Sequence, residues 1–247
     1  MVARGNAVAM AWMLTLGACV APPDVARSPD EVRAAVARSG AVARTLYAEL
    51  AMGFRSPERD ASTSAVLRYR APDTLRLTAF VDVVLDTRPV FDLVIDGGRY
   101  TFVVHEDGAA APHTETGETN RLAEIQPMLA GFHWTREGLF FPGAGVVANA
   151  EVGREGTGMY TVEGGLSTGA RATWVVDGAS LDVVRARVHA RGETFEIEYA
   201  EHGELAGRRL PRRTTLVDKR RKIAVTAVVS ALELEVAHED DAFAVQD

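Results

Sequence analysis

The most constraining feature of this sequence is an alternation of apolar and polar residues that recurs from Leu46 almost to the C-terminus. In residues 46–55 (LYAELAMGFR) every second side chain is apolar. A period of two is typical of a β-strand with one apolar face, because successive side chains of a strand point to opposite sides of the sheet. The pattern predicts about ten or eleven strands. They cover residues 46–54, 65–70, 75–83, 90–95, 100–104, 159–163, 170–176, 181–190, 194–200, 208–217 and 223–236.

Short turns separate most of these strands, which makes neighbouring strands antiparallel. Asp96-Gly97-Gly98 is a tight hairpin signal, because glycine readily adopts positive φ. Residues 56–63 are interpreted as a polar loop and residues 107–119 (DGAAAPHTETGET) as a flexible insertion. In the last strand the apolar positions shift from odd to even numbers near Ser230 and Ala231. This shift predicts a β-bulge that bends the strand.

Helices are few. The stretch Ser28-Pro29-Asp30-Glu31 predicts a helix start with a capping box, and the helix is expected to run to about Ser39. A second helix is expected over 120–131, with a break at its proline, and 132–147 is ambiguous. Two or three helices are too few for alternating βαβ units. The predicted fold class is therefore α+β, mostly β: one large, curved antiparallel sheet whose concave face is covered by these helical segments.

The N-terminus has the order of a signal peptide, predicted over residues 1–18. Arg4 supplies a positive charge, and Ala7–Leu16 (AVAMAWMLTL) is an apolar run too short to span a bilayer. Gly17 and Ala18 are small residues, as a cleavage site requires.

The junction Leu16-Gly17-Ala18-Cys19 resembles the lipobox of bacterial lipoproteins. That resemblance implies a diacylglyceryl thioether and an N-acyl chain on Cys19, so membrane lipid is the first expected partner. Residues 19–27 are then a lipidated tether, and 28–247 form a single domain. The alternative is a plain secretory signal with a chance cysteine. Val20 follows the cysteine with no aspartate that would indicate inner-membrane retention, so the expected location is the outer membrane, facing the periplasm.

Composition excludes several classes of protein. The 247 residues hold 27 Lys+Arg against 34 Asp+Glu without a basic stripe, which argues against nucleic acid as a partner. Cys19 is the only cysteine, so the fold has no internal disulfide. Cleavage before Cys19 would leave 229 residues, enough for one sizeable core or at most two small ones.

No catalytic or metal-binding pattern stands out. Residues 165–169 (GLSTG) lack the G-x-S-x-G spacing and are interpreted as a hairpin loop. The six histidines have no i, i+2 or i, i+4 pairing, so neither a metal nor another cofactor is expected. The chain is not expected to be an enzyme, although an envelope enzyme of unknown class is a third hypothesis.

Two charged groups have alternative interpretations. Asp82, Asp86 and Asp92 are assigned by strand parity mostly to a solvated face. The basic run 219–222 (KRRK) is interpreted as an exposed hairpin loop, with a docking point for anionic headgroups or an acidic partner as the functional alternative.

Three stretches resemble the LolA/LolB-like superfamily of envelope lipoprotein carriers. Residues 69–80 (YRAPDTLRLTAF) and 89–104 (PVFDLVIDGGRYTFVV) resemble its strand, turn and aspartate-glycine hairpin. Residues 210–235 (LPRRTTLVDKRRKIAVTAVVSALELE) are similar to its closing strand pair. The order of elements also matches over most of the chain, and a lipidated member is closer to LolB than to soluble LolA.

The resemblance implies an incomplete, half-open β-barrel with a helical lid and an apolar interior that receives acyl chains of lipids or lipoproteins. The expected function is then an outer-membrane lipoprotein in envelope lipid or lipoprotein transport. The alternative is a structural or assembly lipoprotein that docks an envelope protein partner without lipid. Each apolar strand residue is either ordinary core or cavity lining, and the two are not separable by pattern. The candidate cavity residues are Leu50, Met52, Phe54, Leu75, Leu77, Phe91, Leu93, Phe102 and Trp174.

Overall fold

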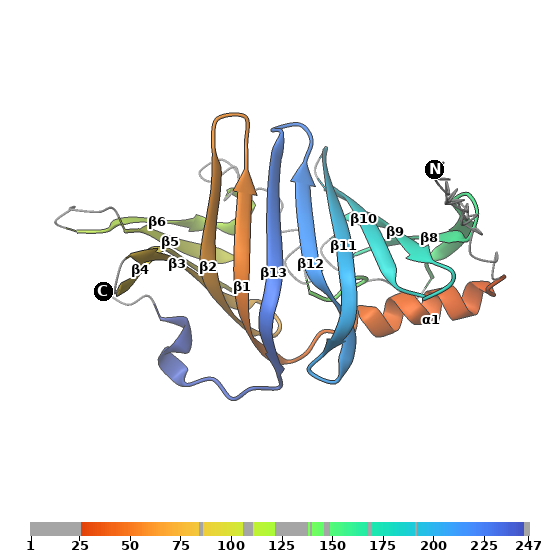
Figure 1. The fold of residues 1–247 in the computed structure, drawn as a ribbon, viewed down its shortest axis with the longest axis horizontal. Coiled ribbons are helices and arrows are strands. Elements are labelled where there is room, and N and C mark those ends of the chain that lie inside the picture. Colours follow the sequence, from red (N-terminus) through yellow and green to blue (C-terminus); the bar gives the residue numbers. More distant parts are fainter. Residues whose placement is uncertain are drawn as a thin grey trace, which may run out of the picture.

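The protein is built around one antiparallel sheet of 13 strands, seen in a computed structural model (Figure 1). The structure describes residues 26–83, 86–105, 111–121, 138, 140–145, 149–166, 169–190 and 192–244. The strand order is β6-β5-β4-β3-β2-β1-β13-β12-β11-β10-β9-β8-β7, and the two edge strands, β6 and β7, do not pair with each other, so the sheet is open. The strands are β1 Thr45–Arg55, β2 Asp60–Arg70, β3 Thr74–Val83, β4 Asp86–Asp96, β5 Arg99–Val104, β6 His113–Glu118, β7 Glu151–Arg154, β8 Met159–Gly165, β9 Arg171–Asp177, β10 Val183–Ala190, β11 Glu193–Leu205, β12 Arg208–Asp218 and β13 Ile223–Leu234.

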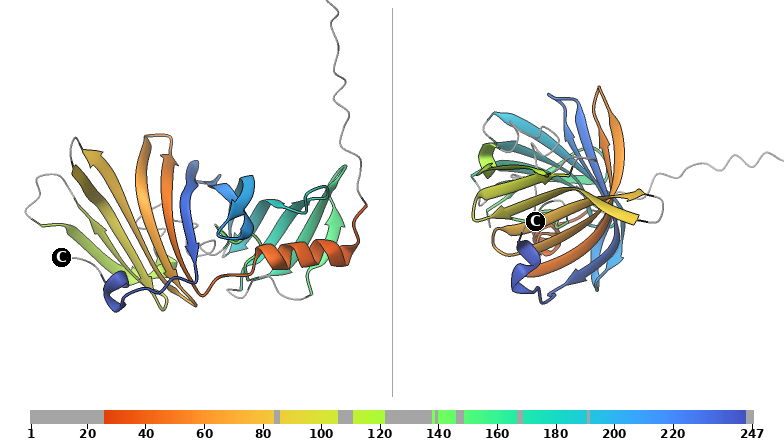
Figure 2. Two further views of the ribbon diagram at one scale, coloured as in Figure 1. Left: turned by 60° about the horizontal axis from the view of Figure 1, so that its bottom comes forward. Right: turned by 90° about the vertical axis from the view of Figure 1, so that its left-hand side faces the viewer.

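Two meanders make up this sheet. Strands β1–β6 run outward in one direction and β13–β7 in the other, and the two halves join where the first strand pairs with the last. The sheet is strongly twisted and bends around one face (Figure 2). The right-handed twist of paired strands produces such a shape when many strands follow one another. The open, curved antiparallel sheet of a mostly β chain confirms this part of the predicted fold class, whereas the helical lid stays a prediction.

The predicted helix is α1, Pro29–Ser39. Its capping box is present: the Ser28 hydroxyl accepts the Glu31 N–H at 3.2 Å, and the Glu31 carboxylate accepts the Ser28 N–H at 2.8 Å. The apolar side of the helix buries Val32 and Val36 against the half of the sheet formed by β7–β10. Two helical segments were expected to cover the concave face of the sheet. The helix predicted over 120–131 lies outside the described residues, except that 120–121 end a 3-10 turn, η1 (Thr119–Arg121).

The predicted strand count was too low, because two edge strands were missed. Strand β6 (HTETGE) falls in the region interpreted as a flexible insertion, and β7 (EVGR) has only four residues. The assignment of 56–63 to a loop was also wrong beyond Arg59, since β2 begins at Asp60. Backbone pairing holds these mostly polar segments in the sheet, and they contain too few apolar residues for the hydrophobic period to reveal them.

The predicted bulge is confirmed at Ser230. Glu49 pairs with Ala231 and the next residue, Leu50, pairs with Val229, so Ser230 is the extra residue on β13. Its hydroxyl donates a hydrogen bond to the Glu49 carbonyl at 3.0 Å. The bulge returns the apolar residues of β13 to the concave face, which is why their numbering changes from odd to even.

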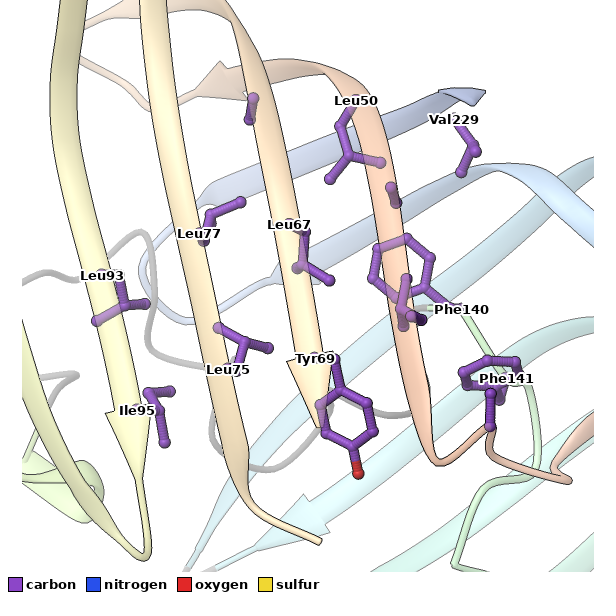
Figure 3. Packing of buried hydrophobic residues seen from close by; sticks show 14 of the residues in the cluster. Leu50, Leu67, Tyr69, Leu75, Leu77, Leu93, Ile95, Phe140, Phe141 and Val229 are labelled. Carbon is purple, nitrogen blue, oxygen red and sulfur yellow. The ribbon is translucent and has the colours of Figure 1, made fainter. Parts of the chain in front are cut away.

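The concave face carries two clusters of buried apolar residues. The first core cluster lies mainly on β1–β5, with Leu210 of β12 and Val229 of β13, and the second lies under α1 on β8–β12. The first includes Leu46, Leu50, Leu67, Tyr69, Leu75, Leu77, Leu93, Ile95, Tyr100, Phe102, Phe140, Phe141 and Leu210 (Figure 3). The second includes Val32, Val36, Tyr160, Trp174, Val176, Val188, Phe195, Ile197 and Tyr199.

The opposite face of β3 and β4 holds a buried ion pair. The Arg76 guanidinium donates Nε–H and Nη2–H to the two Asp92 carboxylate oxygens, each at 3.0 Å, and the Thr78 hydroxyl also donates to Asp92. The C-terminal 3-10 turn η3 (Asp240–Phe243) lies over them, with the Ala242 carbonyl 3.5 Å from Arg76 Nη1. The assignment of Asp92 to a solvated face was therefore wrong, because only 3% of this residue is exposed.

Candidate functional site

The candidate site is the concave face of β1–β5. Strand pairing places Leu46 of β1 beside Tyr69 of β2, and Leu67 of β2 beside Leu77 of β3. Leu77 in turn pairs with Leu93 of β4. This strand register places apolar side chains in rows across five strands, so they form one continuous surface.

The structure brings together seven of the nine candidate cavity residues. Five are buried in the first core cluster and two, Met52 and Phe91, are half-buried against it; Phe91 and Phe102 contact each other with ring centroids 5.5 Å apart. Phe54 lies further along β1, outside the described cluster. Trp174 belongs to the second core cluster, beneath α1. The five buried candidates are Leu50, Leu75, Leu77, Leu93 and Phe102.

Residues 140–145 (FFPGAG), called here the plug segment, fill this face. Phe140 and Phe141 bury their rings in the first core cluster (Figure 3). In the described part of the chain, a cavity of about 10 Å³ lies beside them. That is about the space of one water molecule, whereas ligand pockets typically measure about 300–1,000 Å³. The cavity is lined by Val42, Leu46, Leu67, Tyr69, Leu75, Phe140 and Phe141.

Close backbone packing holds the plug segment against the end of α1. Gly143 has φ +93° and lies so near Val36 that a Cβ at this position would be 2.6 Å from the Val36 carbonyl oxygen. Gly40, which ends α1, is equally crowded, since its own Cβ would lie 2.3 Å from the Gly143 carbonyl carbon. Both positions therefore require glycine.

A buried phenol and a guanidinium make further contacts to this region. The Tyr199 hydroxyl donates to the Gly138 carbonyl at 2.7 Å. Burial raises the pKa of Tyr199 well above its ordinary value, so the phenol stays protonated and remains a donor. The Arg208 guanidinium lies 5.1 Å from the centroid of the Phe141 ring, at cation–π distance.

The chemistry of the cavity lining is apolar. Its one polar side chain is the Tyr69 phenol, which donates to the Pro72 carbonyl at 3.0 Å. In the described part of the chain, no group of three or more His, Cys, Asp or Glu residues is placed to hold a metal ion. Such a lining can exclude water and accept hydrocarbon, and it offers no nucleophile or acid–base pair.

A larger groove of about 590 Å³ lies elsewhere, along the tips of the β1–β2 and β12–β13 hairpins. Gly53, Thr226 and Thr215 are paired neighbours across β1, β13 and β12, and they face away from the concave side that carries Leu50. The groove is open, and Arg55, Asp60 and Ser62 contribute to its wall. Phe54, Ala61 and Ala224 line it beside these polar groups, so the open groove gives an acyl chain no continuous apolar lining.

The basic run 219–222 is mostly neutralised, which supports its interpretation as an exposed hairpin loop. Arg221 pairs with Glu193 at 2.7 Å and with Asp218 at 2.6 Å, and Lys219 pairs with Glu196 at 2.6 Å. The hydrogen bond from Lys219 lowers the pKa of the Glu196 carboxyl. These carboxylates neutralise the positive charges of Lys219 and Arg221 that an anionic partner would need to bind.

The fold and the site together define an open, curved antiparallel sheet with an apolar concave face. No protein-family model matches the sequence, and neither does any curated protein. Among solved structures, a LolA superfamily protein from Nitrosomonas europaea matches with 11% identity and a TM-score of 0.57, covering 89% of this chain and 99% of that one. A Vibrio parahaemolyticus domain provisionally named an outer membrane lipoprotein-sorting protein matches with 10% identity and a TM-score of 0.48, covering 87% and 95%.

At these sequence identities the similarity concerns the fold alone, and the fold assignment rests on the Nitrosomonas europaea structure. The protein has the LolA-like fold that the sequence resemblance implied. The stretches behind that resemblance correspond to β2–β5 and to the β12–β13 hairpin. No helix in the described part of the chain combines the length and hydropathy needed to cross a bilayer.

Proposed function

We propose that this protein is a lipidated envelope protein that binds acyl chains of lipids or lipoproteins on the concave face of β1–β5. The proposal rests on the way in which this face is covered by apolar side chains. Two phenylalanine rings from a distant loop fill it, and the cavity lining is apolar throughout except for one satisfied phenol. An acyl chain can replace such rings without leaving a polar group unpaired.

The energetics favour hydrocarbon as the ligand. Each methylene group that moves from water to an apolar environment contributes about 0.8 kcal/mol. Half-buried side chains extend the apolar face beyond the filled cavity, so a long chain has a surface to follow. These side chains are Met52, Phe91, Val104, Leu232 and Leu234.

Anchoring through Cys19 is compatible with access to this face. The backbone N–H of Arg27 donates to the Tyr160 hydroxyl at 2.7 Å, and its Nε–H donates to the Gly178 carbonyl at 2.9 Å. The tether therefore joins the domain at β8 and the β9–β10 turn, at the opposite end of the sheet from β1–β5 (Figure 1). Residues 20–26 span at most about 25 Å when extended. Membrane attachment at that end leaves the candidate site uncovered, and the outer membrane remains the proposed location.

A volume change at the edge of the site tests the proposal. The mature domain should bind the fluorescent fatty acid parinaric acid saturably, and Phe91→Trp should weaken this binding about tenfold because the larger ring occupies the path of the chain. Phe91 is half-buried, so the domain should keep its melting temperature. The same change at Leu77, which is 1% exposed, should instead overpack the core and lower the free energy of unfolding by about 1–3 kcal/mol.

Val94→Trp is the matched control. Val94 lies on the same strand and is also half-buried, but it faces the opposite side of the sheet. It should leave parinaric acid affinity unchanged. Equal weakening by both substitutions, or no saturable binding by the unaltered domain, would contradict lipid binding on the concave face.

A further inference from the structure

Arg208 lies at the rim of the candidate site. It begins β12 and shares its face with Leu210, which is buried in the first core cluster. Its Nη2–H donates to the Arg38 carbonyl at the end of α1, at 3.2 Å, while the guanidinium lies against the Phe141 ring. Arg208 therefore contacts both the helix end and the plug segment.

The charge of Arg208 has no acidic partner among the described residues. Two of the other three arginines of the same strand are neutralised: Arg209 forms two hydrogen bonds of 2.7 Å to the Asp182 carboxylate, and Arg213 lies 2.8 Å from Glu201. Hydrogen bonding to Arg209 lowers the pKa of Asp182 despite the opposing effect of burial. Arg208 instead has an aromatic ring and a backbone carbonyl as its described partners.

We propose that Arg208 recognises the anionic phosphate headgroup of an acyl lipid whose chain takes the place of Phe141. The inference rests on the proposed function and names its ligand class. The cavity of about 10 Å³ beside the Phe141 ring is too small for an acyl chain while the ring is in place, so the ring and a chain that enters there exclude each other. A chain that enters at Phe141 brings its headgroup to Arg208.

The physical chemistry of the guanidinium favours this exchange. Its planar set of N–H donors matches the oxygens of a phosphate group, and charge-assisted hydrogen bonds are stronger than contact with a phenyl face. An anionic lipid therefore offers Arg208 a better partner than Phe141 while its chain fills the space that the ring leaves. A zwitterionic lipid of equal chain length is attracted less strongly to Arg208, because its ammonium group repels the guanidinium.

Competition between two lipids tests the inference. Diheptanoyl phosphatidylglycerol and diheptanoyl phosphatidylcholine have the same chains and differ only in the headgroup. Each is titrated below its micelle concentration against the mature domain loaded with the neutral dye N-phenylnaphthylamine. The phosphatidylglycerol should displace the dye at about tenfold lower concentration, and Arg208→Gln should remove that preference. Inorganic phosphate should displace no dye.

Arg171→Gln is the matched control, since it removes the same charge from an exposed position on β9. It should keep the preference for phosphatidylglycerol, and both variants should keep the melting temperature of the unaltered domain within a few degrees. Equal displacement by the two lipids, or a preference that survives in Arg208→Gln, overturns the inference alone. Absence of any saturable dye or lipid binding would instead contradict the proposed function.

Discussion

Replacement of Asp92 by alanine is expected to lower the free energy of unfolding by about 3–5 kcal/mol. The side chains of Arg76 and Asp92 are 6% and 4% exposed, and they form two parallel hydrogen bonds beneath η3. Without the carboxylate, a buried guanidinium loses its counter-charge, and the Thr78 hydroxyl loses its acceptor. Urea denaturation followed by circular dichroism measures the change.

Two variants make this expectation specific. Arg55 and Asp60 form a 3.8 Å pair on the same sheet, with side chains 79% and 71% exposed, so Asp60→Ala should cost less than about 1 kcal/mol. The double change Arg76→Met with Asp92→Leu replaces the buried pair by apolar groups and should recover most of the lost stability. A loss below about 1 kcal/mol in Asp92→Ala would show that the pair is not buried as described.

The second large effect concerns the membrane anchor. Cys19→Ser should abolish labelling by radioactive palmitate and move the protein from the membrane fraction to the soluble periplasmic fraction. Stable anchoring requires more than one acyl chain, and the expected modification of Cys19 supplies them together. The loss should therefore be complete rather than partial.

Val20→Ala, at the next position, keeps the cysteine and should keep both the label and the membrane fraction. Fractionation of the labelled membranes on a sucrose gradient then tests the proposed outer-membrane location. Equal palmitate labelling of the unaltered protein and Cys19→Ser would instead favour a plain secretory signal.

The architecture of the sheet was largely predictable, because alternation of apolar residues reports directly on strands with one buried face. The same alternation also located the bulge near Ser230, since one extra residue in a strand shifts the apolar positions from odd to even numbers. Strand β6 could not be found in this way, because its sequence, HTETGE, contains no apolar residue to mark a buried face. Its place depends on backbone hydrogen bonds to β5, which any sequence can make.

The candidate site was only partly predictable, for a different physical reason. Parity correctly placed Leu77 and Phe91 on one face and Asp92 on the other. Parity does not reveal what covers each face. Asp92 is buried because η3 folds back from the far end of the chain, and the concave face is filled by Phe140 and Phe141 from a segment whose pattern was ambiguous. The role of Arg208 depends on the same long-range contact.

Native mass spectrometry of Cys19→Ser protein, purified without detergent from the periplasm, tests acyl-chain binding most directly. Without the covalent anchor, any added mass must come from bound molecules. We expect complexes heavier than the polypeptide by the mass of acyl lipids, which are released on denaturation and are depleted in Phe91→Trp but retained in Val94→Trp. Recovery of the bare polypeptide alone, even after incubation with phospholipid vesicles, would contradict the carrier function and favour a lipoprotein that docks a protein partner.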